Sequence, residues 1–303
     1  RIRHSNQVQI NPEVGTMDAN YVCCLSRTTL RKYALKFLIL LLLLPLLAGA
    51  ADYHHVHMRA IDTLRAATWY ADNMNGEQLR VAEFYGVRFE RTLLLFAETT
   101  RPGADGSAAP AALLNSNGTA LDHLGFSFAD LEAQLISLQL AGAKVIQPIT
   151  KVGGLFSYAI IEDPWGQKVE VMHDPELIGL HHAHVVSTDP GGAIQWYQQM
   201  FGGDATTFKN QPMLPAIRYG DFWLIASKSN QEPTTNMFTM LDHLGFRMID
   251  VESEMDRMAN AKTKILAAAR SYYWWQMLPF MPGPKQGFIE SPDGVVIEVL
   301  QTN

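Results

Sequence analysis

The sequence predicts an α+β fold that occurs twice in tandem along most of the chain. The hexapeptide LDHLGF stands at 121–126 and returns unchanged at 241–246. Two further pairs of segments match in the same order, and the offset is 120 to 128 residues for all three pairs. Within each copy, period-two alternation and helical periodicity follow one another. Self-similarity at one period marks repeated structural units, so we predict two domains, 51–176 and 177–303.

The other two matches lie at the two ends of each copy. HHVHMRAID at 54–62 corresponds to HHAHVVSTD at 181–189. EDPWGQKVEVM at 162–172 corresponds to ESPDGVVIEVL at 290–300. Each copy therefore begins with a histidine-rich segment and ends with a segment that carries a glutamate.

Each copy is predicted to contain two smaller units, in which a strand and a helix precede further strands. In the first unit, YHHVHMRA at 53–60 alternates in a way typical of a strand. Residues 61–74 have helical spacing, and 79–98 supply further strands. A loop rich in Gly, Ala, Pro and Ser follows at 101–119.

A second unit then repeats the pattern. ADLEAQLISLQLAG, at 129–142, places Leu131, Leu135 and Leu138 on one helical face and ends at a glycine. Strands are predicted at 121–128, 143–150, 156–163 and 167–173, with a turn between the last two. The second copy repeats this order, with helices predicted at 187–203 and 249–269.

Composition favours a globular protein. The 303 residues suffice for two domains of ordinary size. The chain is 48% hydrophobic and 18% charged, and its net charge is −6. Because no Lys/Arg-rich block follows residue 51, nucleic acid is not an expected partner.

The first 50 residues have the pattern of a secretory signal peptide. The apolar run 37–50 ends in Ala48-Gly49-Ala50, and four basic residues precede it: Arg27, Arg31, Lys32 and Lys36. We therefore expect cleavage after Ala50 and export to the periplasm or the medium, with no stable membrane span left. The run is shorter than the roughly 20 residues of a spanning helix, so tethering by an uncleaved anchor is the alternative. Met17 is a candidate start, and residues 1–16 are set aside.

Both cysteines, Cys23 and Cys24, lie in this leader. Residues 51–303 therefore contain no thiol that could form a disulfide or bind a metal. Any metal bound by this part of the chain must be held by histidines and carboxylates.

Histidines alternate along the first strand of each copy. Since side chains point to opposite faces in turn, His55 and His57 are predicted to share one face and His54 the other. The same pattern recurs at 181–184.

Two histidines and a glutamate in each copy form a candidate metal site. His123 lies in the middle of LDHLGF and Glu170 in the middle of the last strand of its copy, so both could converge with His55. Two imidazoles and one carboxylate with open positions suit a divalent ion, Fe(II) or Mn(II) above all, with Zn(II) and Ni(II) as alternatives. The second copy offers a corresponding trio: His182, His243 and Glu298. A lone strand histidine is more often a packing residue, but two complete trios would require six coincidences.

The order of a strand-borne histidine, an LDHLGF-type histidine and a [DS]PxGxxxE strand resembles the vicinal oxygen chelate superfamily. This superfamily includes glyoxalase I, extradiol dioxygenases and bleomycin-resistance proteins. The resemblance covers 51–303 and implies two tandem glyoxalase-like domains, each of paired βαβββ modules with a curved mixed sheet around a metal cleft. It implies metal ligands at the six positions named above, on the first and last strands of the modules.

The sequence departs from glyoxalase I in one respect. That enzyme takes a fourth ligand, Glu or Gln, from the last strand of the leading module, and the matching positions here fall near Leu94 and Leu224. Glu98 lies at the end of its strand and is expected to be too far along the strand to act as the fourth ligand. A site with three protein ligands resembles the extradiol dioxygenases and argues against isomerisation of a glutathione hemithioacetal, the lactoylglutathione lyase reaction.

Three functional classes follow. The first is a metal-dependent enzyme, dioxygenase-like or a lyase or isomerase, that binds a small substrate through vicinal oxygens. His57, His184 and Tyr158 are its candidate acid–base or supporting residues. The second is a non-catalytic small-molecule-binding protein of the bleomycin-resistance kind, which would not need the complete ligand sets. The third has one active domain and one domain with a structural or partner-binding role. A second copy of the chain, in a homodimer, is a further candidate partner.

The aromatic run SYYWWQMLPFMPGP, at 271–284, has two interpretations. It could wall or cover an apolar pocket, because such sites are lined with aromatic side chains. It could equally be a core strand followed by a loop.

Overall fold

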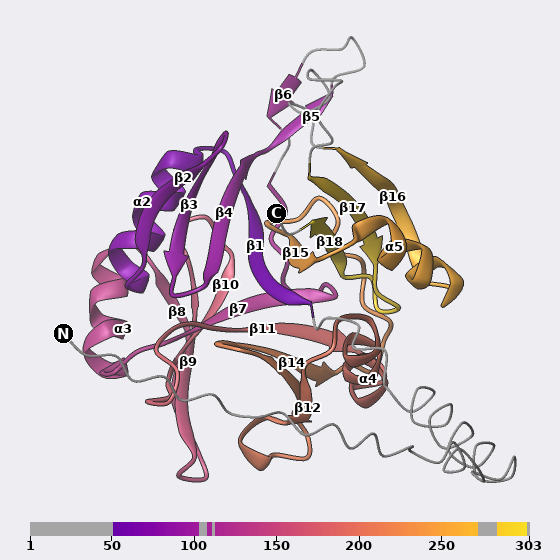
Figure 1. Ribbon diagram of the computed structural model, residues 1–303. Helices are drawn as coiled ribbons and strands as arrows, with labels where there is room; N and C mark the ends of the chain where they lie inside the picture. Colours follow the sequence, from indigo (N-terminus) through magenta and orange to yellow (C-terminus); the bar gives the residue numbers. More distant parts are fainter. Residues whose placement is uncertain (1–50, 103–107, 111–112, 272–283, 302–303) are drawn as a thin grey trace, which may run out of the picture. The chain divides into compact units, whose positions relative to one another are not determined.

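The computed structural model describes residues 51–102, 108–110, 113–271 and 284–301, all within one compact unit. In this part of the chain, four modules share one order: a strand, a helix and three further strands (Figure 1). Modules 1 and 2 belong to the first copy, and modules 3 and 4 to the second. The leader 1–50 and nearly all of the aromatic run 271–284 lie outside the described residues.

The elements have the following bounds. Module 1 contains β1 (Asp52–Ala60), α2 (Thr63–Met74), β2 (Glu77–Val81), β3 (Phe84–Phe89) and β4 (Thr92–Glu98). Module 2 contains β7 (Leu121–Ser127), α3 (Leu131–Leu140), β8 (Lys144–Val152), β9 (Phe156–Glu162) and β10 (Lys168–His173). Module 3 contains β11 (Gly179–Ser187), α4 (Pro190–Phe201), β12 (Asp204–Thr207), the 3₁₀ turn η1 (Phe208–Asn210), β13 (Pro215–Tyr219) and β14 (Phe222–Lys228). Module 4 contains β15 (Leu241–Met248), α5 (Val251–Asn260), β16 (Lys264–Ser271), β17 (Lys285–Glu290) and β18 (Val296–Gln301). The short strands β5 (Thr100–Pro102) and β6 (Ala108–Pro110) pair with each other.

Each of the four α-helices in the described part of the chain begins after an aspartate. These side chains accept a hydrogen bond from the backbone N–H three residues further on, which satisfies one of the free donors of the first turn. The four caps are Asp62, Asp130, Asp189 and Asp250. The sequence placed the helices correctly except for the last. Residues 249–269 were predicted as one helix, but α5 ends at Asn260, and Lys262 has a left-handed φ of 65° that starts the turn into β16.

Apart from β5 and β6, the strands that the structure describes form two mixed sheets of eight strands each. In the first sheet the order is β16-β17-β18-β15-β1-β4-β3-β2, which joins module 4 to module 1. In the second the order is β12-β13-β14-β11-β7-β10-β9-β8, which joins module 3 to module 2. At the centre of each sheet, the first strands of the two modules pair antiparallel, β1 with β15 and β7 with β11 (Figure 1).

This pairing corrects one expectation. The fold is α+β with paired modules and mixed sheets, as predicted, but the two modules of one sheet come from different copies. The periodicity of a strand reports which face is buried and not which neighbour it pairs with. We call this arrangement the exchange of modules between the two copies. Because β1 and β15 carry nearly the same pattern as β11 and β7, the sequence did not reveal it.

The two faces of each sheet differ. Alternate residues of β4, such as Leu94 and Phe96, are almost fully buried and belong to the main apolar core with the helices. On the opposite face of each sheet, the central strands carry the histidines and glutamates of the candidate sites. Module 1 and module 2 also meet on the helix side, where the Tyr70 hydroxyl donates a hydrogen bond of 2.8 Å to Asp163 Oδ2.

The segments that precede β7 and β15 are hydrogen-bonded to each other. The Ser116 hydroxyl lies 2.8 Å from the Thr239 hydroxyl and accepts a hydrogen bond of 2.7 Å from the Leu241 amide. All three residues are buried, so these bonds tie the first copy to the second. Among the described residues, no helix is long and apolar enough to cross a bilayer.

Candidate metal centres

The exchange of modules assembles two clusters of side chains that could hold a metal ion, one on each sheet. We call His55, His243 and Glu298 centre 1, which lies on the sheet of modules 1 and 4. We call His123, Glu170 and His182 centre 2, which lies on the sheet of modules 2 and 3. All six ligands predicted from the sequence are therefore in one cluster or the other.

The predicted grouping of these residues was wrong. The sequence suggested one trio for each copy, whereas each centre takes one histidine from one copy and a histidine and a glutamate from the other. The reason is the exchange: β1 lies beside β15, and β11 lies beside β7. Strand order, which the sequence does not encode locally, decides which ligands meet.

Centre 1 is a compact triangle of ligand atoms. His55 Nε2 lies 3.1 Å and His243 Nε2 3.4 Å from the same oxygen, Glu298 Oε2. The two Nε2 atoms are 3.4 Å apart. An ion about 2.1 Å from each ligand atom, the usual length of bonds from such ions to imidazole and carboxylate, fits over this triangle.

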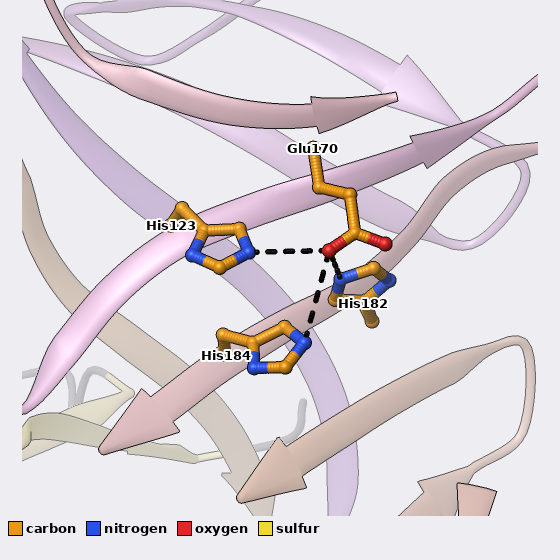
Figure 2. A group of neighbouring side chains, drawn as sticks. All are labelled: His123, Glu170, His182 and His184. Carbon is orange, nitrogen blue, oxygen red and sulfur yellow. Dashed lines mark hydrogen bonds and ion pairs between the residues drawn. The ribbon is translucent and has the colours of Figure 1, made fainter. Parts of the chain in front are cut away.

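Centre 2 has the same composition with wider spacing (Figure 2). Glu170 Oε2 lies 3.5 Å from His123 Nε2 and 3.8 Å from His182 Nε2. A third nitrogen, His184 Nε2, is 4.0 Å from the same oxygen. His182 is fully buried, and its Nε2 has no hydrogen-bond partner. A buried polar atom normally has a partner, so this nitrogen fits an ion as its missing partner.

His57 and His184 accompany the two centres. The ligand atoms of His57, His55 and His243 lie within 4.8 Å of one another, as do those of His184 and centre 2. The ring of His184 is stacked on His123 at 4.5 Å, and its Nδ1 is 2.8 Å from the Ser227 hydroxyl. Either residue is close enough to support or join the ligand set.

The repeated LDHLGF hexapeptide contributes three parts of each centre. Its histidine is a candidate ligand, and the preceding aspartate binds the far nitrogen of that ring. Asp242 Oδ2 lies 2.8 Å from His243 Nδ1, and Asp122 Oδ2 lies 2.5 Å from His123 Nδ1. Such a carboxylate fixes the tautomer and the orientation of a ligand histidine. These aspartates were not identified from the sequence, although both copies spell Asp-His.

The glycine of the hexapeptide makes room for the histidine of the partner strand. Gly125 lies opposite His182, and Gly245 lies opposite His55. A Cβ on Gly125 would lie 1.9 Å from His182 Cε1, and a Cβ on Gly245 would lie 2.1 Å from His55 Cε1. Only glycine therefore allows these rings to lie across the strand, where they face the carboxylate.

A β-bulge changes the predicted faces of the histidine strands. The register of β1 with β15 slips between Tyr53 and His55, so His54 is the extra residue. His54 was predicted to lie on the opposite face, yet its Nδ1 is 2.9 Å from His55 Nδ1. The same bulge in β11 brings His181 Nδ1 to 2.8 Å from His182 Nδ1.

Burial keeps several of these imidazoles neutral. It lowers the pKa of His57, His182 and His184 well below the ordinary value, and neighbouring histidines add to the effect. Burial also acts to raise the pKa of Glu298, but hydrogen bonds from His243 and His55 outweigh it and hold that pKa well below the usual range. Neutral imidazole and ionised carboxylate are the forms that bind a metal.

The strand that holds the fourth ligand in glyoxalase I carries none here. Leu94 and Leu224, the positions matched from the sequence, are almost fully buried in the main core, on the face away from the centres. Leu95 and Ala97 face centre 1 instead and line its cavity. Glu98 is exposed at the end of β4.

A cavity of about 690 Å³ adjoins centre 1. Its walls are mostly apolar, with His54, His57 and Gln286 among the polar groups. Tyr158, a candidate acid–base residue, belongs to the other sheet: it lies opposite Met172 on β10, two residues along from Glu170. Its ring packs in an apolar cluster with Met172 and Phe208. The catalytic roles suggested for Tyr158, His57 and His184 stay predictions.

The comparisons with known proteins agree with this fold. Glyoxalase I from Zea mays has a TM-score of 0.65 at 15% identity, over 83% of this chain and 92% of that one. A putative dioxygenase from Bacillus subtilis has a TM-score of 0.57 at 12% identity, over 83% of this chain and 85% of that one. At these identities the likeness shows the fold alone. No curated protein matches the chain. The sequence matches a family profile twice, at 52–171 and 179–299, and the chain therefore belongs to the Glyoxalase/Bleomycin resistance protein/Dioxygenase superfamily.

Proposed function

We propose that this chain is a divalent-metal enzyme that binds a small molecule with two adjacent oxygen atoms at centre 1. The observation that carries the proposal is the triangle of His55, His243 and Glu298 beside a cavity of about 690 Å³. Three protein ligands leave positions open for substrate oxygens. A bound divalent ion would supply Lewis acidity, stabilising negative charge on those oxygens.

The protein's own groups support this role. Asp242 holds the His243 ring, and Gly245 leaves space for the His55 ring, so both nitrogens are oriented before an ion binds. The mostly apolar surface of the cavity suits a substrate body with little charge. The buried His57 imidazole is neutral and offers a hydrogen-bond acceptor for a substrate hydroxyl.

Within the enzyme class, we favour ring cleavage of a catechol-like diol with Fe(II) and oxygen. The support is the three-ligand set, with Leu95 and Ala97 where a fourth ligand would face the ion. Mn(II) is the other favoured ion, and Zn(II) or Ni(II) would suit lyase or isomerase chemistry on an α-hydroxycarbonyl. The alternative is a non-catalytic binding protein, which the mostly apolar cavity would also suit.

Localisation and assembly belong to the same proposal. The basic head and apolar run of the leader support export, with cleavage after Ala50, and the alternative is a membrane tether. Sequencing the N-terminus of the protein recovered from the exported fraction tests this point. Light scattering tests whether the protein is a homodimer.

The first experiment is the metal content of the protein purified without chelator, followed by oxygen uptake with catechols. Retained iron together with oxygen uptake would support the dioxygenase. A retained metal without oxygen uptake would favour the lyase or isomerase class. Glu298→Gln should abolish activity, whereas Glu98→Gln, at an exposed strand end, should preserve it. A protein that binds a catechol unchanged, with no metal even after reconstitution, would refute the enzyme and leave the binding protein.

A further inference from the structure

The two centres have the same ligands but different surroundings. Module 1 passes from β2 to β3 through two residues, whereas module 3 passes from β12 to β13 through seven, at 208–214. The longer connection carries Phe208, whose side chain is 2% exposed. In module 1 the two connecting residues, Ala82 and Glu83, line the cavity beside centre 1.

Phe208 fills the space beside centre 2. Its ring centroid lies 5.5 Å from that of His181, the neighbour of the ligand His182, and 5.7 Å from that of Trp223. Together with Met172, Ala216 and Ile225 it forms a small buried cluster, separate from the main core. This cluster is on the centre's side of the sheet, because Ile225 lies opposite His184 on the paired strand.

Two matched positions near centre 1 hold a smaller or a more polar side chain, whereas the position opposite the glutamate holds Phe288 at centre 1 and Ile160 at centre 2. Where Trp223 lies beside His182, Leu93 lies beside His55. Where Tyr158 lies opposite Met172, Gln286 lies opposite Leu300. Gln286 and Leu300 both line the 690 Å³ cavity.

An ion-pair network holds the Phe208 connection in place. Lys209 Nζ lies 3.0 Å from Asp174 Oδ2 and 3.0 Å from Glu176 Oε2. Asp174, which is itself buried, lies 3.2 Å from His181 Nε2. In sequence, the position of the first-copy Asp174 is taken by Thr302 in the second copy, so centre 1 has no matching carboxylate.

We infer that Phe208 closes centre 2 to substrate, so that centre 1 binds substrate and centre 2 holds its ion without an organic ligand. The side chains of His123 and Glu170 keep 9% and 10% of their surface exposed, close to the 6% and 9% of His243 and Glu298, so the aromatic cluster around Phe208, and not the burial of the ligands, distinguishes the two centres. This inference rests on the proposed function, because it assigns different roles to two centres that both bind metal.

The test counts ions and a catechol probe on the full chain. The chain is loaded with Mn(II), its metal content is measured, and 4-nitrocatechol is titrated while its absorbance reports chelation. The expected result is two Mn(II) and one 4-nitrocatechol per chain. Glu298→Gln should leave one Mn(II) and no probe, and Glu170→Gln should leave one Mn(II) and one probe.

Phe208→Ala should raise the probe count from one to two at an unchanged two Mn(II). Because truncating a buried phenylalanine can prevent folding, Phe208→Leu and Lys209→Met are made alongside it. Phe128→Ala, at a buried ring outside both centres, is the matched control and should keep one probe.

The outcomes distinguish a failure of this inference from a failure of the proposed function. A wild-type count of two Mn(II) with any number of probes other than one would overturn this inference and leave metal binding intact. So would loss of the probe in Glu170→Gln but not in Glu298→Gln. A chain that binds no Mn(II) would overturn the proposed function and this inference with it.

Discussion

Gly245 lies against the imidazole of His55, so close that a Cβ on residue 245 would lie 2.1 Å from the ring carbon Cε1 and 2.3 Å from Nδ1. The two residues are 190 positions apart in sequence and opposite each other on β1 and β15. Gly125 has the same relationship with His182. The identical hexapeptide supplies the same three parts at each centre: a candidate ligand, the aspartate that orients it, and space for the histidine ring of the paired strand.

Gly245→Ala should therefore disable centre 1 and spare centre 2. The added methyl group cannot coexist with the His55 ring in its present place, so the ring must turn away from Glu298. We expect the metal content to fall from two ions to about one per chain, with the remaining ion bound at wild-type affinity. Metal analysis after dialysis, together with the affinity of each variant for Mn(II), measures this.

Gly191→Ala is the control for that substitution. Gly191 lies in the first turn of α4, and the nearest atom to an added Cβ there is 3.8 Å away. This variant should keep both ions. If Gly245→Ala also kept both ions at unchanged affinity, the fit of the His55 ring over residue 245 would not matter for metal binding.

Metal affinity at centre 1 should rise with pH. Burial lowers the pKa of His243 in the metal-free chain, but hydrogen bonds to Asp242 and Glu298 outweigh it and raise that pKa to about 9. His243 is then protonated at pH 7, and an ion must displace the proton to reach Nε2. Between pH 6.5 and 8 the Mn(II) affinity should increase about tenfold per pH unit, the slope of one released proton. Calorimetry in buffers of different ionisation heat counts the proton.

Asp242→Asn provides the comparison for this pH effect. Removing the carboxylate lowers the His243 pKa, so the affinity should change less steeply over the same range. It should also fall about 10- to 100-fold at pH 8, because the carboxylate that orients the ring is gone. An affinity that is flat with pH in the wild type would show that His243 binds the ion without losing a proton.

Tyr70→Phe should destabilise the fold without changing metal content. The Tyr70 hydroxyl donates to Asp163 Oδ2 at 2.8 Å, and Tyr70 is 1% exposed. Removing the hydroxyl leaves a buried carboxylate oxygen without that donor, which costs about 1–3 kcal/mol of unfolding free energy. Urea unfolding measures the loss, and Tyr85→Phe, at a half-buried ring, should cost less than half as much. Equal stability of Tyr70→Phe and wild type would contradict the role assigned to this bond.

Much of the fold follows from local pattern. The aspartates before each helix, the alternation in the strands and the repeated segments place four helices and the principal strands in order. The error at 249–269 has a local cause as well, because Lys-Ile-Leu-Ala-Ala-Ala is compatible with a helix until pairing with β17 makes it a strand. Tertiary contacts override weak helix propensity at such a segment.

The site was harder to predict than the fold, because it depends on strand order and on single bulges. The six candidate ligands follow from residue type and from the family resemblance, but their grouping follows from β1 pairing with β15, a contact between distant segments. The extra residue in β1 turns His54 toward His55, and simple alternation places it on the wrong face. A more useful local signal was present in the hexapeptide, where the aspartate and the glycine recur with the histidine.

The exchange of ligands between copies predicts how pairs of substitutions combine. His55→Ala with Glu298→Gln removes two ligands of centre 1, so the double variant should keep one ion, as each single variant does. His55→Ala with Glu170→Gln removes one ligand from each centre, so it should bind no ion tightly. If each copy instead held its own trio, the first pair would strip both ions and the second only one. Metal analysis of the two double variants decides between these arrangements, because residues in one site combine non-additively and residues in separate sites add.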